Sequence, residues 1–148
     1  MADEEAKNFS LTEAERLRVQ IEPILIEAME SRRKMAEAEG QLRSLAEKIQ
    51  RSGGMQISYE NVAGMRMERN RLEDTIQEAV ERIHSTGCVV KDLEQGLLDF
   101  PSRIGDEDVY LCWRLGEDRI RFYHRQDEGF AGRKPIDPRD AGYSNPIQ

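Results

Sequence analysis

The chain has 148 residues, and its 22 Lys and Arg against 29 Asp and Glu give a formal net charge of -7. Hydrophobic residues make up 38% of the chain and recur at regular spacing, which excludes a wholly disordered protein. The acidic balance argues against a nucleic-acid partner, and no apolar run reaches the roughly 18 residues that a bilayer-spanning helix needs, so we expect no membrane partner. The acidic segment from Met1 to Glu5 lacks the apolar core of an export signal, and two cysteines cannot build a disulfide framework. We therefore expect a cytoplasmic location.

The composition predicts an α+β protein: a long antiparallel two-helix coiled-coil hairpin, then a small antiparallel β-meander and an irregular C-terminal tail. Residues 1–10 form a polar N-terminal segment, and residues 11–86, rich in Glu, Arg, Ala and Leu, predict the helical hairpin. Residues 87–136, which hold most of the aromatic residues and both cysteines, predict a small antiparallel β domain packed on the helices. Residues 137–148 are the tail.

The first helix is expected to begin at Ser10 or Thr12, because each opens a Ser/Thr-x-x-Glu capping box, and Phe9 precedes it as a hydrophobic staple. Pro23 predicts a kink or a short break. The helix carries a seam of alternating three- and four-residue steps, typical of a left-handed coiled coil. The seam positions are Ala14, Leu17, Ile21, Ile24, Ala28, Ser31, Met35, Ala38, Leu42, Leu45 and Ile49.

A second helix is expected from near Ser58, after a break at Gly53-Gly54, to a glycine C-cap at Thr86-Gly87. The same stepping recurs at Val62, Met65, Arg69, Leu72, Ile76, Ala79 and Ile83. So short a break predicts an antiparallel hairpin, with Leu45 near Met65.

The first helix outreaches the second, so its segment from Ala14 to Ile24 must cover the C-terminal domain or another subunit. Two helices rarely bury enough apolar surface alone, so we expect a homodimer through the helical hairpin, with room for a further protein partner. The alternative is that the C-terminal domain supplies the missing surface.

Four strands are expected, over residues 88–93, 97–104, 109–115 and 120–125. Pro101 demotes the second of them to an edge or irregular strand. A tight turn at Gly116-Glu117, with Leu115 opposite Asp118, sets Val109 beside His124 in the last pair. This register gathers one apolar row for the helices to cover: Val109, Leu111, Trp113, Leu115, Ile120 and Phe122.

The same register gives the other face of the sheet a set of arginines and tyrosines: Tyr110, Cys112, Arg114, Arg119, Arg121, Tyr123 and Arg125. Such a face could hold phosphates and stack bases. Cross-strand stacking of Tyr on Arg at a solvated sheet is the alternative. The acidic surroundings favour that alternative, so we expect no nucleic-acid partner.

The candidate functional cluster lies in the C-terminal domain and consists of Glu117, His124, Glu128 and Arg133, with Asp92 and Asp99 as neighbours from the preceding strands. Imidazole and carboxylates can hold a divalent metal or share proton transfer near neutral pH, and the metal ligands would be His124, Glu117 and Glu128. The segment from Gly129 to Arg133 could instead cradle an anion. The structural alternative is a histidine capped by a carboxylate at a sheet end. No catalytic residue is assigned, and we expect no cofactor, with a divalent metal ion as the alternative.

Several sequence blocks resemble one bacterial family, the domain of unknown function 2203. The specific blocks are Val90 to Leu93, Gly96 to Pro101, Val109 to Glu117 and Gly129 to Pro135, and Phe9 to Ala14 and Pro23 also fit. The resemblance covers residues 9 to about 136. It implies a small prokaryotic, cytoplasmic protein without an assigned activity, and it offers no catalytic residues to carry over.

We therefore expect an uncharacterised cytoplasmic protein that acts as a dimeric interaction or scaffold module without catalytic activity. The alternative is a small enzyme or a metal- or anion-binding protein with its site around His124, Glu117, Glu128 and Arg133.

Overall fold

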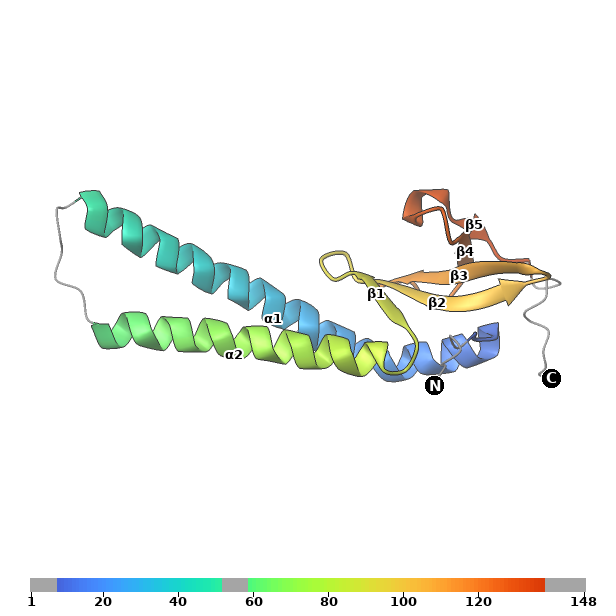
Figure 1. Ribbon diagram of the computed structural model, residues 1–148, viewed down its shortest axis with the longest axis horizontal. Helices are drawn as coiled ribbons and strands as arrows, with labels where there is room; N and C mark the ends of the chain where they lie inside the picture. Colours follow the sequence, from blue (N-terminus) through green and yellow to red (C-terminus); the bar gives the residue numbers. More distant parts are fainter. Residues whose placement is uncertain (1–7, 52–58, 138–148) are drawn as a thin grey trace, which may run out of the picture.

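The computed structural model of the protein describes residues 8–51 and 59–137, and Figure 1 shows two long helices with a sheet at one end of the pair. The elements in chain order are α1 (Leu11–Arg51), α2 (Tyr59–His84), β1 (Val89–Asp92), β2 (Leu97–Ile104), β3 (Glu107–Arg114), β4 (Phe122–Arg125), the 3-10 turn η1 (Phe130–Gly132) and β5 (Lys134–Pro135). The strands form one antiparallel sheet in the order β1-β2-β3-β4-β5. The predicted α+β architecture, a helical hairpin followed by a meander, is confirmed. Within the described ranges, no helix has both the length and the apolar character that crossing a membrane requires.

The beginning of α1 is fixed by the predicted capping box. The Ser10 hydroxyl accepts a hydrogen bond from the Glu13 N–H at 3.1 Å, and the Glu13 carboxylate accepts one from the Ser10 N–H at 3.0 Å. Two amide donors that the first turn leaves free are thereby satisfied. Phe9, just before the box, packs edge-on against Phe100, and its carbonyl accepts a hydrogen bond from the Ser102 hydroxyl at 2.6 Å. Phe9 thus ties the start of α1 to β2.

The helix α1 continues without a break through Pro23. Its axis changes direction in Figure 1 between the dark blue part beneath the sheet and the part beside α2. A proline inside a helix leaves the carbonyl four residues earlier without its helical partner. Here that residue is Val19, which is 58% exposed, so water can satisfy its carbonyl and the helix persists.

The two helices pack antiparallel, as predicted, and α2 ends at the predicted glycine C-cap. The N–H of Gly87 donates to the His84 carbonyl at 3.0 Å, and Gly87 has a φ of 101°, which glycine adopts without steric cost. The predicted break at Gly53-Gly54 and the predicted helix start near Ser58 fall outside the described residues.

Part of the hairpin extends beyond the sheet, and we refer to α1 from Ser31 to Arg51 together with α2 from Tyr59 to Ala79 as the arm. Figure 1 shows the arm projecting from the end of the molecule that carries the sheet.

One face of the sheet packs on the first part of α1 and on the end of α2. The core between these layers contains Phe9, Ala14, Ile21, Leu25, Ile83, Cys88, Leu98, Phe100, Leu111, Trp113 and Ile120. Leu17 and Ile24 pack against this core, so the part of α1 that outreaches α2 covers the sheet of the same chain. Figure 1 places η1 over the opposite face of the sheet.

The predicted register between β3 and β4 is wrong by one residue. Tyr110 pairs with His124 and Leu111 pairs with Tyr123, whereas the expected register set Val109 beside His124. Because side chains alternate along a strand, Phe122 leaves the predicted apolar row for the face that also carries His124, and Tyr123 packs on the core instead. The predicted face of arginines and tyrosines is therefore not formed as expected.

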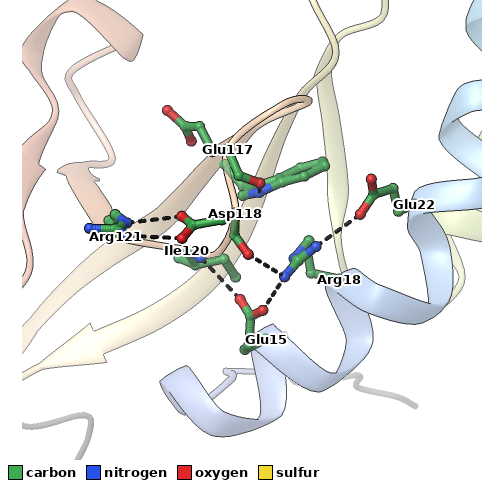
Figure 2. A network of polar contacts seen from close by, with 8 residues as sticks. Glu15, Arg18, Glu22, Glu117, Asp118, Ile120 and Arg121 are labelled. Atoms are coloured by element: carbon green, nitrogen blue, oxygen red, sulfur yellow. Dashed lines mark hydrogen bonds and ion pairs between the residues drawn. The ribbon is translucent and has the colours of Figure 1, made fainter.

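The connection between β3 and β4, residues 115–121, differs from the expected turn. It turns one residue earlier, where the Glu117 N–H donates to the Arg114 carbonyl at 3.0 Å, and the rest of it is held by α1. Figure 2 shows the Glu15 carboxylate accepting the Ile120 N–H at 3.0 Å, and the Arg18 guanidinium donating to the Asp118 carbonyl at 3.1 Å. Arg18 is only 8% exposed and forms an ion pair with Glu15. Ile120 stays in the core although it has left the strand.

Pro101 lies in an interior strand, which corrects the expectation that β2 is an edge strand. The pairing of β1 with β2 stops where Val89 meets Asp99, so Pro101 lies beyond the end of β1. Its carbonyl accepts the N–H of Phe9 at 2.7 Å on that open side, where its missing N–H would also point. Pro101 is thus tolerated at a position where no neighbouring strand requires its N–H.

Candidate functional site

A buried trio of ionisable side chains lies on the sheet face that is turned away from α1: Asp99 from β2, Cys112 from β3 and His124 from β4. Asp99 is directly opposite Cys112, and His124 is diagonal to Cys112 because it pairs with Tyr110. One nitrogen, sulfur or oxygen atom from each side chain lies within 4.8 Å of the others. The three residues are 2%, 1% and 2% exposed, so the strands carry this polar trio into the interior.

The imidazole of His124 has a defined orientation. Its Nδ1 lies 2.8 Å from the carbonyl oxygen of Arg125, which can only accept, so Nδ1 carries a proton. Its Nε2 lies 3.2 Å and 3.3 Å from the two carboxylate oxygens of Asp99. The ring of Tyr110 packs beside the imidazole with centroids 5.5 Å apart. The geometry therefore presents Nε2 to Asp99.

Burial governs the protonation of the other two members of the trio. Desolvation raises the pKa of Asp99, although the nearby His124 acts in the opposite direction. Desolvation, followed by the charge of Asp99, raises the pKa of Cys112 to about 12. Cys112 therefore keeps its proton at neutral pH and is not a nucleophilic thiolate. Burial likewise raises the pKa of Cys88.

Arg133 borders the trio on the side of Cys112, with which its guanidinium interacts. The guanidinium lies between the rings of Phe122 and Phe130, with its central carbon 4.1 Å from each ring centroid. It also donates to the Glu117 carboxylate at 2.7 Å. Its Nη1 atom is buried and has no hydrogen-bond partner among the described residues. Two rings and one carboxylate thus hold a cation against the thiol.

The remaining candidate residues lie apart from the trio. The Glu128 carboxylate accepts from the Lys134 ammonium at 2.9 Å, beside the turn that follows β4. The Asp92 carboxylate accepts from the Glu94 N–H at 2.9 Å, which closes the turn between β1 and β2. Of the candidates, the structure therefore brings Asp99 together with His124, and Glu117 together with Arg133.

Cys112 is the member of the trio that sequence reasoning missed, and a signal for it was present. Gly105 and Asp106 form a two-residue hairpin turn in which Ile104 pairs with Glu107. Counting back along both strands from that turn places Asp99 opposite Cys112. The expected strands, residues 97–104 and 109–115, leave a four-residue turn between them, and a turn of that length leaves this pairing open.

The fold and the trio together define a small α+β protein with a projecting helical arm and a polar cluster buried in its sheet. The chain belongs to the family described as Uncharacterized conserved protein (DUF2203), whose model matches residues 7–136, in agreement with the resemblance seen in the sequence. Comparisons with curated proteins and with solved structures found no match.

Proposed function

We propose that the protein is a non-catalytic interaction module that forms a homodimer through its arm. The observation that carries this proposal is the incomplete burial of the arm's own seam. Only Ser31 and Ala79, at the base of the arm, are buried, at 7% and 3% exposure. The seam positions farther out are all half-buried: Met35, Ala38, Leu42, Leu45, Ile49, Val62, Met65, Leu72 and Ile76. Two helices alone leave this apolar stripe partly open to water, and a four-helix arrangement would close it.

A groove on the arm gives the partner a place to pack. It has a volume of about 630 Å³ and is lined by Glu37, Gly40, Gln41, Ser44, Leu45, Lys48 and Met65. Gly40 and Ser44 are small, so they let another helix approach closely along this side of α1. Leu45 and Met65 supply the apolar surface that such a helix would cover.

The charges of the arm favour a second copy of this chain as the partner. The α1 part of the arm carries six basic residues, Arg32, Arg33, Lys34, Arg43, Lys48 and Arg51, against three acidic ones, Glu37, Glu39 and Glu47. The α2 part carries five acidic residues, Glu60, Glu68, Glu73, Asp74 and Glu78, against three basic ones, Arg66, Arg69 and Arg71. A two-fold dimer can place the basic helix of each copy against the acidic helix of the other.

This role suits a reducing compartment. Both cysteines are free thiols buried within the fold, and neither is engaged in a disulfide. The proposal therefore includes a cytoplasmic location, where thiols stay reduced.

The test is the mass of the full chain in solution, measured by light scattering at micromolar concentration. We expect a mass of two chains, and a dimer that weakens as salt screens the charges between the helices. A mass of one chain throughout the micromolar range would contradict the proposal.

A matched pair of variants locates the interface. Ser44→Glu places a charge inside the groove and is expected to shift the mass towards one chain. Ala46→Glu adds the same charge to an exposed position of the same helix outside the groove lining, and is expected to leave the dimer intact. Equal dimerisation of both variants would show that the groove is not the contact surface.

A further inference from the structure

We propose that Asp99, Cys112 and His124 form a binding site for one divalent transition metal ion with zinc-like ligand preferences. The three side chains offer one carboxylate oxygen, one sulfur and one imidazole nitrogen within 4.8 Å of one another. Mixed nitrogen, sulfur and oxygen ligands of this kind suit Zn²⁺ and its neighbours in the first transition row. The site is independent of the arm and of the proposed dimer.

The orientation of His124 supports this inference. Its Nδ1 donates to the Arg125 carbonyl at 2.8 Å, an arrangement that fixes a metal-binding imidazole and leaves Nε2 as the ligand atom. Nε2 then faces the Asp99 carboxylate, which is also an acceptor when ionised. Two acceptors buried face to face need a positive charge between them, and a metal ion or a proton can supply it.

The distances favour the metal ion. Nε2 lies almost equally far from the two Asp99 oxygens, at 3.2 Å and 3.3 Å. A charge-assisted hydrogen bond between such groups is typically shorter, at about 2.7–2.9 Å. With metal–ligand bonds of about 2.0–2.1 Å, two ligand atoms on neighbouring corners of a tetrahedron are roughly 3.3–3.4 Å apart. The observed separation is close to this spacing, so Nε2 and the carboxylate could bind one metal ion with little movement.

The charges around Cys112 also favour a bound metal ion. A thiolate and a carboxylate together would balance the charge of a divalent cation. The buried Nη1 of Arg133 lacks a hydrogen-bond acceptor among the described residues, and the guanidinium lies beside Cys112. A thiolate is an acceptor, so metal binding, which displaces the thiol proton, would satisfy this donor. Arg133, held by Glu117, acts as a positioning residue for the thiolate. The three protein ligands leave a fourth tetrahedral position for water.

Cobalt titration of the full-length, reduced and chelator-treated protein tests the proposal. Co²⁺ bound to a thiolate gives a sulfur-to-metal charge-transfer absorption, and tetrahedral coordination intensifies its visible bands. We expect both signals to saturate at one Co²⁺ per chain and to disappear when Zn²⁺ is added. A folded wild-type protein that shows no saturable cobalt spectrum would overturn the proposal.

Cys88 provides the matched control, because it is as buried as Cys112 but lies outside the trio. Cys112→Ser is expected to lose the charge-transfer band, and Cys88→Ser is expected to keep it. If Cys88→Ser lost the band and Cys112→Ser kept it, Cys112 would not be the sulfur ligand, and the proposed site would be overturned. Asp99→Asn and His124→Gln are expected to weaken cobalt binding at least about 10-fold, and Arg133→Met about 10- to 100-fold with the band retained.

A second measurement needs no variant and covers the case in which Cys112→Ser does not fold. X-ray absorption of the zinc-loaded wild-type protein is expected to show one sulfur at about 2.3 Å and nitrogen or oxygen ligands at about 2.0–2.2 Å. A zinc shell without sulfur would refute the assignment of Cys112.

Discussion

Replacing Gly96 with alanine is expected to destabilise the protein far more than the same change at Gly105. Both glycines have positive φ values, 73° and 62°, so either alanine adopts a strained left-handed backbone. They differ in their surroundings. A Cβ at Gly96 would lie 2.9 Å from the Cβ of Leu115 and 3.1 Å from the sulfur of Met29, whereas a Cβ at Gly105 meets nothing within 4 Å.

The magnitude follows from these two contributions. The left-handed backbone costs a non-glycine residue about 1–2 kcal/mol, and both variants carry that cost. The crowding at Gly96 adds about 1–3 kcal/mol, because Leu115 cannot retreat freely: its N–H donates to the Gly96 carbonyl itself at 2.9 Å. We expect Gly96→Ala to lower the free energy of unfolding by about 2–5 kcal/mol and Gly105→Ala by about 1–2 kcal/mol.

Urea denaturation followed by circular dichroism measures both changes, at one fixed chain concentration because a dimer makes the midpoint depend on concentration. In thermal scans the extra loss at Gly96 corresponds to a melting temperature lower by about 3–4 °C per kcal/mol. Equal losses in the two variants would refute the reasoning, since they would show that the close approach of Gly96 to Leu115 does not constrain the fold.

Three further outcomes follow from the capping box, an ion pair and the buried thiols. Ser10→Ala is expected to lower the free energy of unfolding by about 1 kcal/mol in urea, because the Glu13 N–H loses its acceptor, and an unchanged midpoint would contradict this. A backbone hydrogen bond from Arg125 and the Lys134 ion pair lower the pKa of Glu128 from its ordinary value of 4.5. The stabilisation by Glu128 is therefore present above pH 4.5 and is lost as the pH falls through the lower, folded-state pKa, so wild type and Glu128→Gln should differ near neutral pH and converge in acid. Cys88 and Cys112 should react with a thiol reagent at pH 8 only after unfolding, and rapid labelling of the native chain would show that the sheet is open.

The helical part of the fold could be predicted because its signals are local. The capping box at Ser10 and the glycine after α2 act within one helical turn, and both form as expected. The seam predicts the hairpin because it depends only on the period of apolar residues. It does not show that Arg18 and Leu25 are buried at the sheet, since that depends on which face of α1 the strands cover.

The candidate site could be predicted only in part, because its geometry depends on contacts between distant segments. The connection that leads into β4 is bound through the Ile120 N–H to Glu15, more than a hundred residues earlier in the chain. No local pattern contains that bond, and the observed register of β4 places His124 on the face of the sheet that carries Asp99. A cysteine within a strand is usually a buried packing residue, and only the pairing of Cys112 with Asp99 shows that it belongs to a polar cluster.

Because α1 is one continuous helix, the distance from the sheet to the tip of the arm depends on the number of residues in the arm. The segment from Ser31 to Arg51 is straight helix at about 1.5 Å per residue, so the tip stands roughly 30 Å from the base. Removing one heptad from each helix would draw the tip inward by roughly 10 Å while keeping the phase of the stripe. The sheet and its buried trio would not change, so the length of the arm could be varied without altering Asp99, Cys112 and His124.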